Sequence, residues 1–277
     1  MKRACCWVLL LLTTVLSTSS LRAADSTATI FSTVGNDIAI VWSDIGPFFT
    51  RPLSFDKHDW FLTAGVIGGT AVATLADSSG RHAALSMSHA SSTNSVMDVF
   101  RHYGDNYGIL GACSIAYLGG LAFDNSWLRV TGRELIETLA LAGTTSGLLK
   151  FVIGRTRPYV GAGNYDFHPF SFANEKYSMP SGHTTVAFSI SSVLAARIDH
   201  PVATVLLYGI AATTAFSRMY HDQHWFSDTF LGAAIATTTG LWVNHRDDAR
   251  QNKPTRSIEN NLEVSPTFGG LSLTYKF

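Results

Sequence analysis

Three short clusters in the second half of the sequence carry side chains that could bind an anion and attack it. The first cluster is Lys150-Phe-Val-Ile-Gly-Arg-Thr-Arg157-Pro158, in which Lys150 ends an apolar segment and Arg157 follows seven residues later. Pro158 cannot continue a helix, so both cations are expected at a helix terminus. Two cations leaving one helix end can hold an anion between them.

The second cluster is Pro180-Ser181-Gly182-His183, directly ahead of the apolar segment 184–196. Serine is a favoured residue at a helix N-cap, and glycine lets a ligand approach the backbone closely. The free N–H groups of a helix start attract anions. This pattern predicts a phosphate site at the start of a helix, with His183 beside it.

The third cluster is Ser217-Arg218-Met-Tyr-His-Asp-Gln-His224-Trp-Phe-Ser-Asp228. Arg218 adds a third cation. His224 and Asp228 are four residues apart and share a face if this segment is helical. A carboxylate that accepts the Nδ1–H of an imidazole fixes its tautomer and leaves Nε2 free to attack. We therefore expect a nucleophile and the group that orients it.

The elements that position these clusters are predicted to be helices. Six apolar segments each have the length of one helix, so the expected fold is all-α, with a six-helix core. An amphipathic helix is expected before them at residues 34–49, ended by Pro47 and Pro52, and a short strand after them at residues 269–277. The six segments are residues 60–76, 107–123, 134–150, 184–196, 202–217 and 229–244.

Two connections stand out. Residues 77–106 form a Ser- and His-rich linker, in which His82, His89 and His102 lack the compact spacing of metal ligands, so no metal site is predicted. Residues 155–178 form a long loop rich in Gly, Pro, Tyr and Phe. Its aromatic side chains are expected to pack on the protein, with a wall for a lipid or prenyl chain as the alternative.

The composition limits the classes of protein. Of 277 residues, 46% are hydrophobic and only 14% are charged, with 20 basic and 20 acidic side chains. Soluble domains usually have about 25% charged residues, so this chain must bury most of its length, and disorder is excluded. The balanced charge argues against a nucleic-acid partner.

The N-terminus resembles a secretory signal peptide. Lys2 and Arg3 precede a short apolar run, and small residues follow up to Ala24. We expect residues 1–24 to be removed, residues 25–245 to form one helical domain, and residues 246–277 to form a polar tail. Cys5 and Cys6 would leave with the peptide, and Cys113 is expected to be a small buried side chain without a disulfide partner.

The sequence leaves two relations to the membrane open. Uncharged stretches of 17 and 18 residues, at 60–76 and 106–123, fall just short of the roughly 20 needed to cross a bilayer. After a cleaved signal peptide, six spans would put the loops that carry the three clusters in the cytoplasm. An exported, periplasmic protein that is soluble or attached to the membrane surface avoids this conflict and is favoured. An integral multi-span protein is the alternative.

Together, the patterns Lys-x6-Arg-Pro, Pro-Ser-Gly-His and Ser-Arg-x5-His-x3-Asp resemble the type-2 phosphatidic acid phosphatase family. This family shares its fold and motifs with bacterial non-specific acid phosphatases and vanadium haloperoxidases. The resemblance spans residues 150–228 in the motifs and about 60–244 in the six-helix core. It implies that His224 is the nucleophile, Asp228 its partner and His183 the acid, and that the phosphoryl oxygens are bound by Lys150, Arg157, Ser181, Gly182 and Arg218.

The resemblance implies a phosphatase that forms a phosphohistidine and needs no metal or cofactor, because three cations and helix N–H groups neutralise the phosphate. The expected substrate is a lipid phosphate, such as phosphatidate, phosphatidylglycerol phosphate, a prenyl diphosphate or a lipid A phosphate, met at a membrane surface. One alternative is a soluble acid phosphatase of broad specificity, and another is a vanadate-dependent haloperoxidase. A non-enzymatic binding protein fits poorly because no motif position is missing.

Three neighbouring residues are assigned lesser roles. The distance in sequence from Ser217 and Arg218 selects His224 as the nucleophile, so His221 and Asp222 are not expected to act directly. Arg155 is expected to be a solvated cation or a support behind the site, not a phosphate ligand. The sequence does not predict the oligomeric state.

Overall fold

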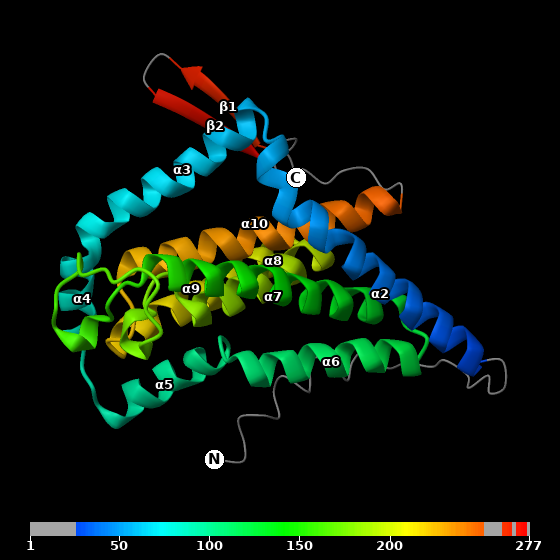
Figure 1. Cartoon of the computed structure of the whole chain (residues 1–277), viewed down its shortest axis with the longest axis horizontal. Coiled ribbons are helices and arrows are strands. Elements are labelled where there is room, and N and C mark those ends of the chain that lie inside the picture. Colours follow the sequence, from blue (N-terminus) through cyan, green and yellow to red (C-terminus); the bar gives the residue numbers. More distant parts are fainter. Residues whose placement is uncertain (1–25, 252–261, 268–269, 276–277) are drawn as a thin grey trace.

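The computed structural model describes residues 26–251, 262–267 and 270–275 (Figure 1). The predicted signal peptide lies outside the described residues. The helices are α2 Ser26–Thr50, α3 Lys57–Ala73, α4 Asp77–Leu85, α5 Ser91–His102, α6 Asn106–Ala122, α7 Ser126–Ile153, α8 Gly182–Ile198, α9 Pro201–Tyr220 and α10 Phe226–Arg250. Short 3-10 turns occupy Arg51–Ser54, Thr74–Ala76, Pro158–Val160 and Asn174–Lys176. Residues 26–251 are therefore all-α.

The helix ends follow from local chemistry. The side chains of Asp105 and Asn125 accept hydrogen bonds from the backbone N–H groups of Tyr107 (3.1 Å) and Leu128 (3.0 Å), which caps the starts of α6 and α7. Helix α7 ends at Gly154, whose φ of 59° is left-handed and favours glycine. The end of α7 matters because Lys150 and Arg157 lie on either side of it.

The long helices pack around α8. Helices α7, α8 and α10 contact one another, α6 covers α7, and α9 covers α8 (Figure 1). The prediction that the Cys113 side chain is buried is confirmed, since it lies in the core shared by α6, α7 and α8. That core consists of Cys113, Leu135, Val186, Ile190 and Val193.

Glycines bring α6 and α7 into backbone contact. A Cβ on Gly120 would lie 2.3 Å from the backbone N of Arg129, and a Cβ on Gly132 would lie 2.6 Å from that of Tyr117. No larger residue fits either position without separating the helices. Close approach at small residues is common between membrane helices, which have little hydrophobic driving force to associate.

Helix α2 contacts the bundle mainly through its charges, although Phe48 near its end also packs against Trp242 of α10. Asp37 and Asp44 are buried, and they pair with Arg129 on α7 and Arg246 on α10. Trp42, on the opposite face, is 76% exposed. Burial of acidic side chains is favourable only when they are paired. Most of the apolar face of this helix, including Phe31 and Ile38, is therefore left uncovered by the described part of the chain.

Three helical segments are long and apolar enough to cross a membrane. They are Lys57–Leu85, Ser126–Ile153 and Pro201–Tyr220. Large apolar side chains on them point outwards, with Phe61 76% and Val205 72% exposed. Helix α7 extends well beyond the apolar segment 134–150 predicted from the sequence, because its charged first turns pair within the protein. These features support membrane association.

The predicted linker 77–106 is not a loop. Most of it forms α4 and α5, which tertiary contacts hold in place. The Arg81 guanidinium on α4 binds both carboxylate oxygens of Asp222 at 2.6 and 2.7 Å, and the Thr214 hydroxyl on α9 donates to the carbonyl of Phe100 on α5 at 2.9 Å. The linker therefore covers the end of the bundle where the site lies.

The C-terminal part contains a two-stranded antiparallel hairpin. Strand β1, Leu262–Thr267, pairs with β2, Gly270–Tyr275, in the register Leu262 opposite Tyr275. Strand β2 overlaps the strand predicted at residues 269–277. Helix α10 continues to Arg250, into the segment predicted as a polar tail.

Candidate active site

The three sequence clusters lie at helix ends that meet at one end of the bundle. Lys150 is in the last turn of α7 and Arg218 in the last turn of α9. His183 is in the first turn of α8 and Asp228 in the first turn of α10. Figure 1 shows the α7–α8 connection beside α4 at this end. Four helix termini thus bring residues that are far apart in the sequence to one place.

His224 lies in the turn between α9 and α10 and is fully enclosed. Its Nδ1 is 2.8 Å from the carbonyl oxygen of Ser178 and 3.6 Å from Oδ2 of Asp228. A ring nitrogen facing a carbonyl must carry the proton, so the geometry assigns Nδ1–H and a bare Nε2. The Nδ1–H thus points to the carbonyl of Ser178, and the predicted hydrogen bond from Nδ1 to Asp228 is not formed at 3.6 Å. Burial lowers the pKa of His224 to about 3, although Asp228 opposes this shift.

Asp228 is completely buried and bound on every side. Its Oδ2 accepts hydrogen bonds from the Ser178 hydroxyl and from the backbone N–H of Trp225 (2.8 Å), and its Oδ1 accepts one from Nη1 of Arg155 (2.8 Å). A carboxylate with three donors stays ionised. Its negative charge is fixed on the Nδ1 side of the His224 ring.

The three predicted phosphate-binding cations have no acidic partner among the described residues. Nζ of Lys150 donates to the carbonyl oxygens of Tyr177 (2.9 Å) and Pro180. Nη1 of Arg157 donates to Oε1 of Gln223 (3.1 Å). Arg218 is only 6% exposed and its Nε has no partner within the described chain. Buried cations without carboxylates create a strong local positive potential that an anion can neutralise.

These cations act on one another and on both histidines. Lys150 lies within electrostatic range of Arg157, Arg218 and Asp228. His183 lies within range of Arg218 and Arg157. The structure therefore brings together both histidines, Asp228 and the three cations.

Ser181 and Gly182 begin α8 beside Lys150. The backbone N–H of Ser181 donates to the carbonyl of Asp228 at 2.9 Å, which ties the start of α8 to the start of α10. The Ser181 hydroxyl does not cap the helix but accepts a bond from the Thr184 hydroxyl at 3.0 Å. A Cβ on Gly182 would lie 3.9 Å from Cε of Lys150. The sequence correctly predicted Ser181 at the N-cap position, but it did not predict that the Ser181 hydroxyl would bind Thr184.

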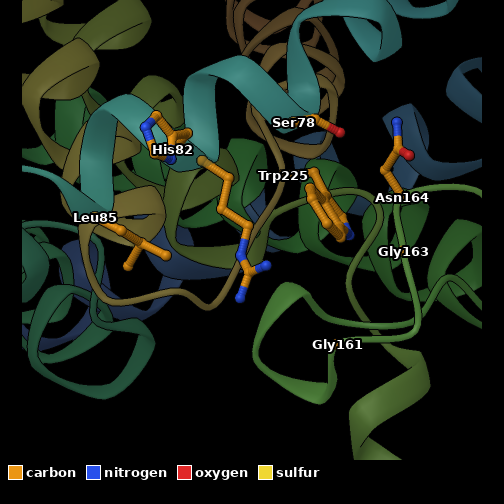
Figure 2. Close-up of a pocket in the computed structure, with 8 residues that line it drawn as sticks. Ser78, His82, Leu85, Gly161, Gly163, Asn164 and Trp225 are labelled. Atoms are coloured by element: carbon orange, nitrogen blue, oxygen red, sulfur yellow. The ribbon is translucent and has the colours of Figure 1, made fainter.

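Two cavities adjoin the site. One of about 490 Å³ lies between α6, α7 and α8, with apolar side chains such as Leu110 and Leu139 along it and Lys150 and Gly182 in its wall. The other, of about 290 Å³, lies between α4 and the α7–α8 loop. Figure 2 shows Trp225 between Ser78 and His82 of α4 and Asn164 of the loop.

The model of the PAP2 superfamily matches residues 132–251. Residues 132–251 form a PAP2-superfamily domain. The match contains the three motifs, most of α7 and helices α8 to α10, and it confirms the resemblance drawn from the motifs at the level of the superfamily. Within this PAP2 domain, every residue of the predicted site lies at a helix end or in a connection.

Curated relatives agree with this placement. The chain is 31% identical over 164 residues to a lipid A 1-phosphatase of Porphyromonas gingivalis, covering 56% of this chain and 34% of the relative. It is 31% identical over 121 residues to a lipid A 1-phosphatase of Rhizobium johnstonii, covering 43% of this chain and 46% of the relative. The chain thus spans less than half the length of either relative.

A solved structure shows the same fold. The transmembrane PAP2-type phosphatidylglycerolphosphate phosphatase of Bacillus subtilis superposes with a TM-score of 0.54 and 20% sequence identity. The superposition covers 67% of this chain and 96% of that chain. At this identity, the likeness concerns the fold of the PAP2 domain alone.

Several residues around the PAP2 site were not found from the sequence. Ser178 supplies both the carbonyl that binds His224 and the hydroxyl that binds Asp228. Asp77 on α4 and Ser227 on α10 are buried behind them. Arg155 is not solvated, as one alternative held, but is fully buried against Asp228. No short sequence spacing links the residues in these contacts, so the sequence alone could not have revealed them.

The neighbouring candidates lie outside the centre of the PAP2 site. Asp222 binds Arg81, and Nε2 of His221 is 3.5 Å from Asp98. In the described residues no group of three or more His, Cys, Asp or Glu side chains is arranged to hold a metal ion. Of the aromatic loop residues, Phe170 and Phe172 pack edge-on or tilted against Phe151 of α7.

Gly232 controls the distance between the two helix starts of the site. A Cβ there would lie 2.7 Å from the carbonyl oxygen of Ser181. We expect Gly232→Ala to push α8 away from α10, to cost about 1–3 kcal/mol of stability and to lower kcat/KM about tenfold or more through misplaced groups. Thermal unfolding and steady-state assays measure both effects.

The matched control is Gly209→Ala on α9, where a Cβ meets nothing within 4 Å. This variant should be as stable as the wild type, or slightly more stable, and fully active. Equal behaviour of the two variants would contradict the close approach of α8 and α10.

Proposed function

We propose that the chain is a metal-independent phosphatase that hydrolyses a lipid phosphate through a phosphohistidine on His224. The observation that carries this proposal is the combination of three cations that pair with no acidic side chain of the described residues and an imidazole whose Nε2 is bare. Such cations attract a phosphate group and stabilise the charge on its equatorial oxygens during transfer. A fixed neutral imidazole is a suitable nucleophile for phosphorus.

In the first step, Nε2 of His224 attacks phosphorus in line with the bond to the leaving oxygen. The N–P bond forms as the P–O bond breaks, and the proton on Nδ1 remains hydrogen-bonded to the carbonyl of Ser178. His183 gives its proton to the leaving oxygen. In the second step, water attacks phosphorus, passes a proton to His183 and releases inorganic phosphate from His224.

Lys150, Arg157 and Arg218 bind the phosphoryl oxygens, together with the Ser181 hydroxyl and the backbone N–H of Gly182. Because these groups are fixed before the substrate binds, they need little rearrangement as charge develops. They do the work that Mg²⁺ does in many phosphotransferases, so activity should persist in the presence of a chelator.

The cavity between α6, α7 and α8 supports a lipid substrate. Its apolar walls suit an acyl or prenyl chain, and Lys150 and Gly182 in its wall place the phosphate of such a lipid at the cations. The two lipid A 1-phosphatase relatives support a phosphate carried on a lipid.

The same proposal places the protein in a membrane. Helices α3, α6, α7, α8, α9 and α10 would form its six-helix core, with the amphipathic α2 at one side and the C-terminal strand beyond it. The three membrane-length segments and their exposed apolar side chains support this arrangement. The exported, periplasmic protein favoured from residues 1–24, soluble or attached to the membrane surface, is the alternative, because six spans after a cleaved signal peptide would put the site in the cytoplasm.

The experiment that tests the proposal fills the cavity. Gly143 lies in the cavity wall on α7, and a Cβ there meets nothing within 4 Å. We expect Gly143→Leu to lower kcat/KM for dispersed phosphatidate or lipid A about tenfold or more, while hydrolysis of p-nitrophenyl phosphate is unchanged. Gly209→Leu, at an equally open position on α9, is the control.

Assays contain a chelator throughout. Loss of both activities by Gly143→Leu alone would contradict an acyl site in this cavity. A wild-type enzyme that prefers soluble esters over every lipid would instead favour the broad acid phosphatase. Halide oxidation that requires vanadate and peroxide, without phosphate release, would favour the haloperoxidase.

A further inference from the structure

Arg155 joins two buried carboxylates that the three motifs do not connect. Its Nη1 lies 2.8 Å from Oδ1 of Asp228 and its Nη2 lies 2.6 Å from Oδ2 of Asp77. All three side chains are 0% exposed. Nε of Arg155 also donates to the carbonyl of Asn164 in the α7–α8 loop at 3.0 Å. The guanidinium is therefore locked in one orientation.

Asp77 binds the start of α10 as well as Arg155. Its Oδ1 accepts the backbone N–H of Ser227 at 2.8 Å, and its Oδ2 accepts the Ser227 hydroxyl at 2.8 Å. A carboxylate at free N–H groups stabilises a helix start. Ser227 immediately precedes Asp228, so Asp77 fixes the backbone from which Asp228 extends.

The charges of this group have a direct consequence for His224. One guanidinium is shared by two carboxylates, so Asp77, Arg155 and Asp228 together carry one net negative charge. Arg155 holds Oδ1 of Asp228, and Oδ2 of Asp228 lies 3.6 Å from Nδ1 of His224. Because the group is buried, this charge is poorly screened. It favours the positive charge that the imidazole gains when Nε2 bonds to phosphorus.

We infer that Asp77 and Arg155 are positioning residues of the proposed phosphatase, acting on His224 through Asp228. The inference rests on the proposed function of His224 as the nucleophile. It gives α4, the first part of the Ser- and His-rich segment, a role in catalysis. Neither residue reaches the phosphate, so substrate binding should not depend on them.

The test compares Asp77→Asn and Arg155→Lys with a matched control, Arg81→Lys. Arg81 also joins α4 to the α9–α10 turn, by two half-buried bonds of 2.6 and 2.7 Å to Asp222, but it forms no hydrogen bond with Asp228. The purified full chain is assayed with p-nitrophenyl phosphate for kcat and KM, and with inorganic phosphate for its inhibition constant. Thermal unfolding is recorded for each variant.

We expect Asp77→Asn and Arg155→Lys each to lower kcat about a hundredfold, the size of effect that misplacement of a reacting group produces. The inhibition constant of phosphate should change less than about threefold, because the three cations are untouched. The kcat of the double variant should be no lower than that of the less active single variant, since the two residues act as a unit. Arg81→Lys should keep wild-type kcat.

Wild-type kcat in both single variants would overturn the inference. So would parallel losses of kcat, phosphate affinity and unfolding temperature, which would indicate a purely structural role. His224→Ala is included to separate the two claims. If that variant is active, the proposed function fails; if it is inactive while Asp77→Asn and Arg155→Lys are fully active, only the positioning role fails.

Discussion

Replacing His224 with alanine is expected to abolish phosphatase activity, with kcat reduced by at least about 10⁴-fold. The residue is the only imidazole in the described chain that combines full burial, a fixed Nδ1–H and a direct neighbour in Asp228. Without Nε2 no covalent intermediate can form, and water would have to attack phosphorus directly. Steady-state assays with p-nitrophenyl phosphate and a lipid phosphate measure the loss.

The control for this variant is His221→Ala, three residues earlier in the same turn. Nε2 of His221 lies 3.5 Å from Asp98 on α5, whereas Ser178 and Asp228 lie beside His224. This variant should keep most of its activity. An inactive His221→Ala enzyme, together with an active His224→Ala enzyme, would show that His224 is not the nucleophile.

The second large effect is expected at Arg218. Its side chain is buried, forms no ion pair with the described residues and leaves Nε without a partner. Removal of one preorganised donor to a transition-state oxygen typically costs about 10²–10³ in rate. We expect Arg218→Ala to lose this much kcat/KM, and Arg218→Lys to recover only part of it because lysine lacks the planar fork of donors.

Arg51→Ala is the matched control for the removal of one positive charge. Arg51 forms an exposed ion pair with Asp59 at 2.9 Å, and such pairs contribute little. This variant should be as active and as stable as the wild type. If Arg218→Ala retained wild-type kcat/KM and phosphate inhibition, the phosphate would have to bind elsewhere.

The sequence predicted the long helices and the clusters at their ends because both depend on local patterns. Apolar runs of 13 to 17 residues mark α3, α6, α8 and α9 directly. Helix α7 begins earlier than the predicted segment 134–150, and the charged residues Arg129 and Arg133 lie in this added part. In the structure they pair with Asp37 of α2, a contact between segments about 90 residues apart.

The environment of the nucleophile depended on contacts that spacing cannot reveal. The i,i+4 relation correctly placed Asp228 beside His224. The nearer partner is a carbonyl of Ser178, which lies 46 residues earlier in a loop. Likewise, α4 forms in a segment whose composition favours a loop, because Asp77 and Arg81 bind Ser227 and Asp222, which are far away in the sequence.

The most direct measurement is the trapping of the phosphorylated enzyme. His183→Ala is mixed with p-nitrophenyl phosphate, whose leaving group departs without a proton, so the first step proceeds while hydrolysis of the intermediate is slowed. After rapid quenching at alkaline pH, the protein is digested and analysed by mass spectrometry. We expect one acid-labile phosphoryl group on the peptide that contains His224, and none in His183→Ala/His224→Ala. Steady release of p-nitrophenol without phosphate on His224, or phosphate on another residue, would contradict the central claim.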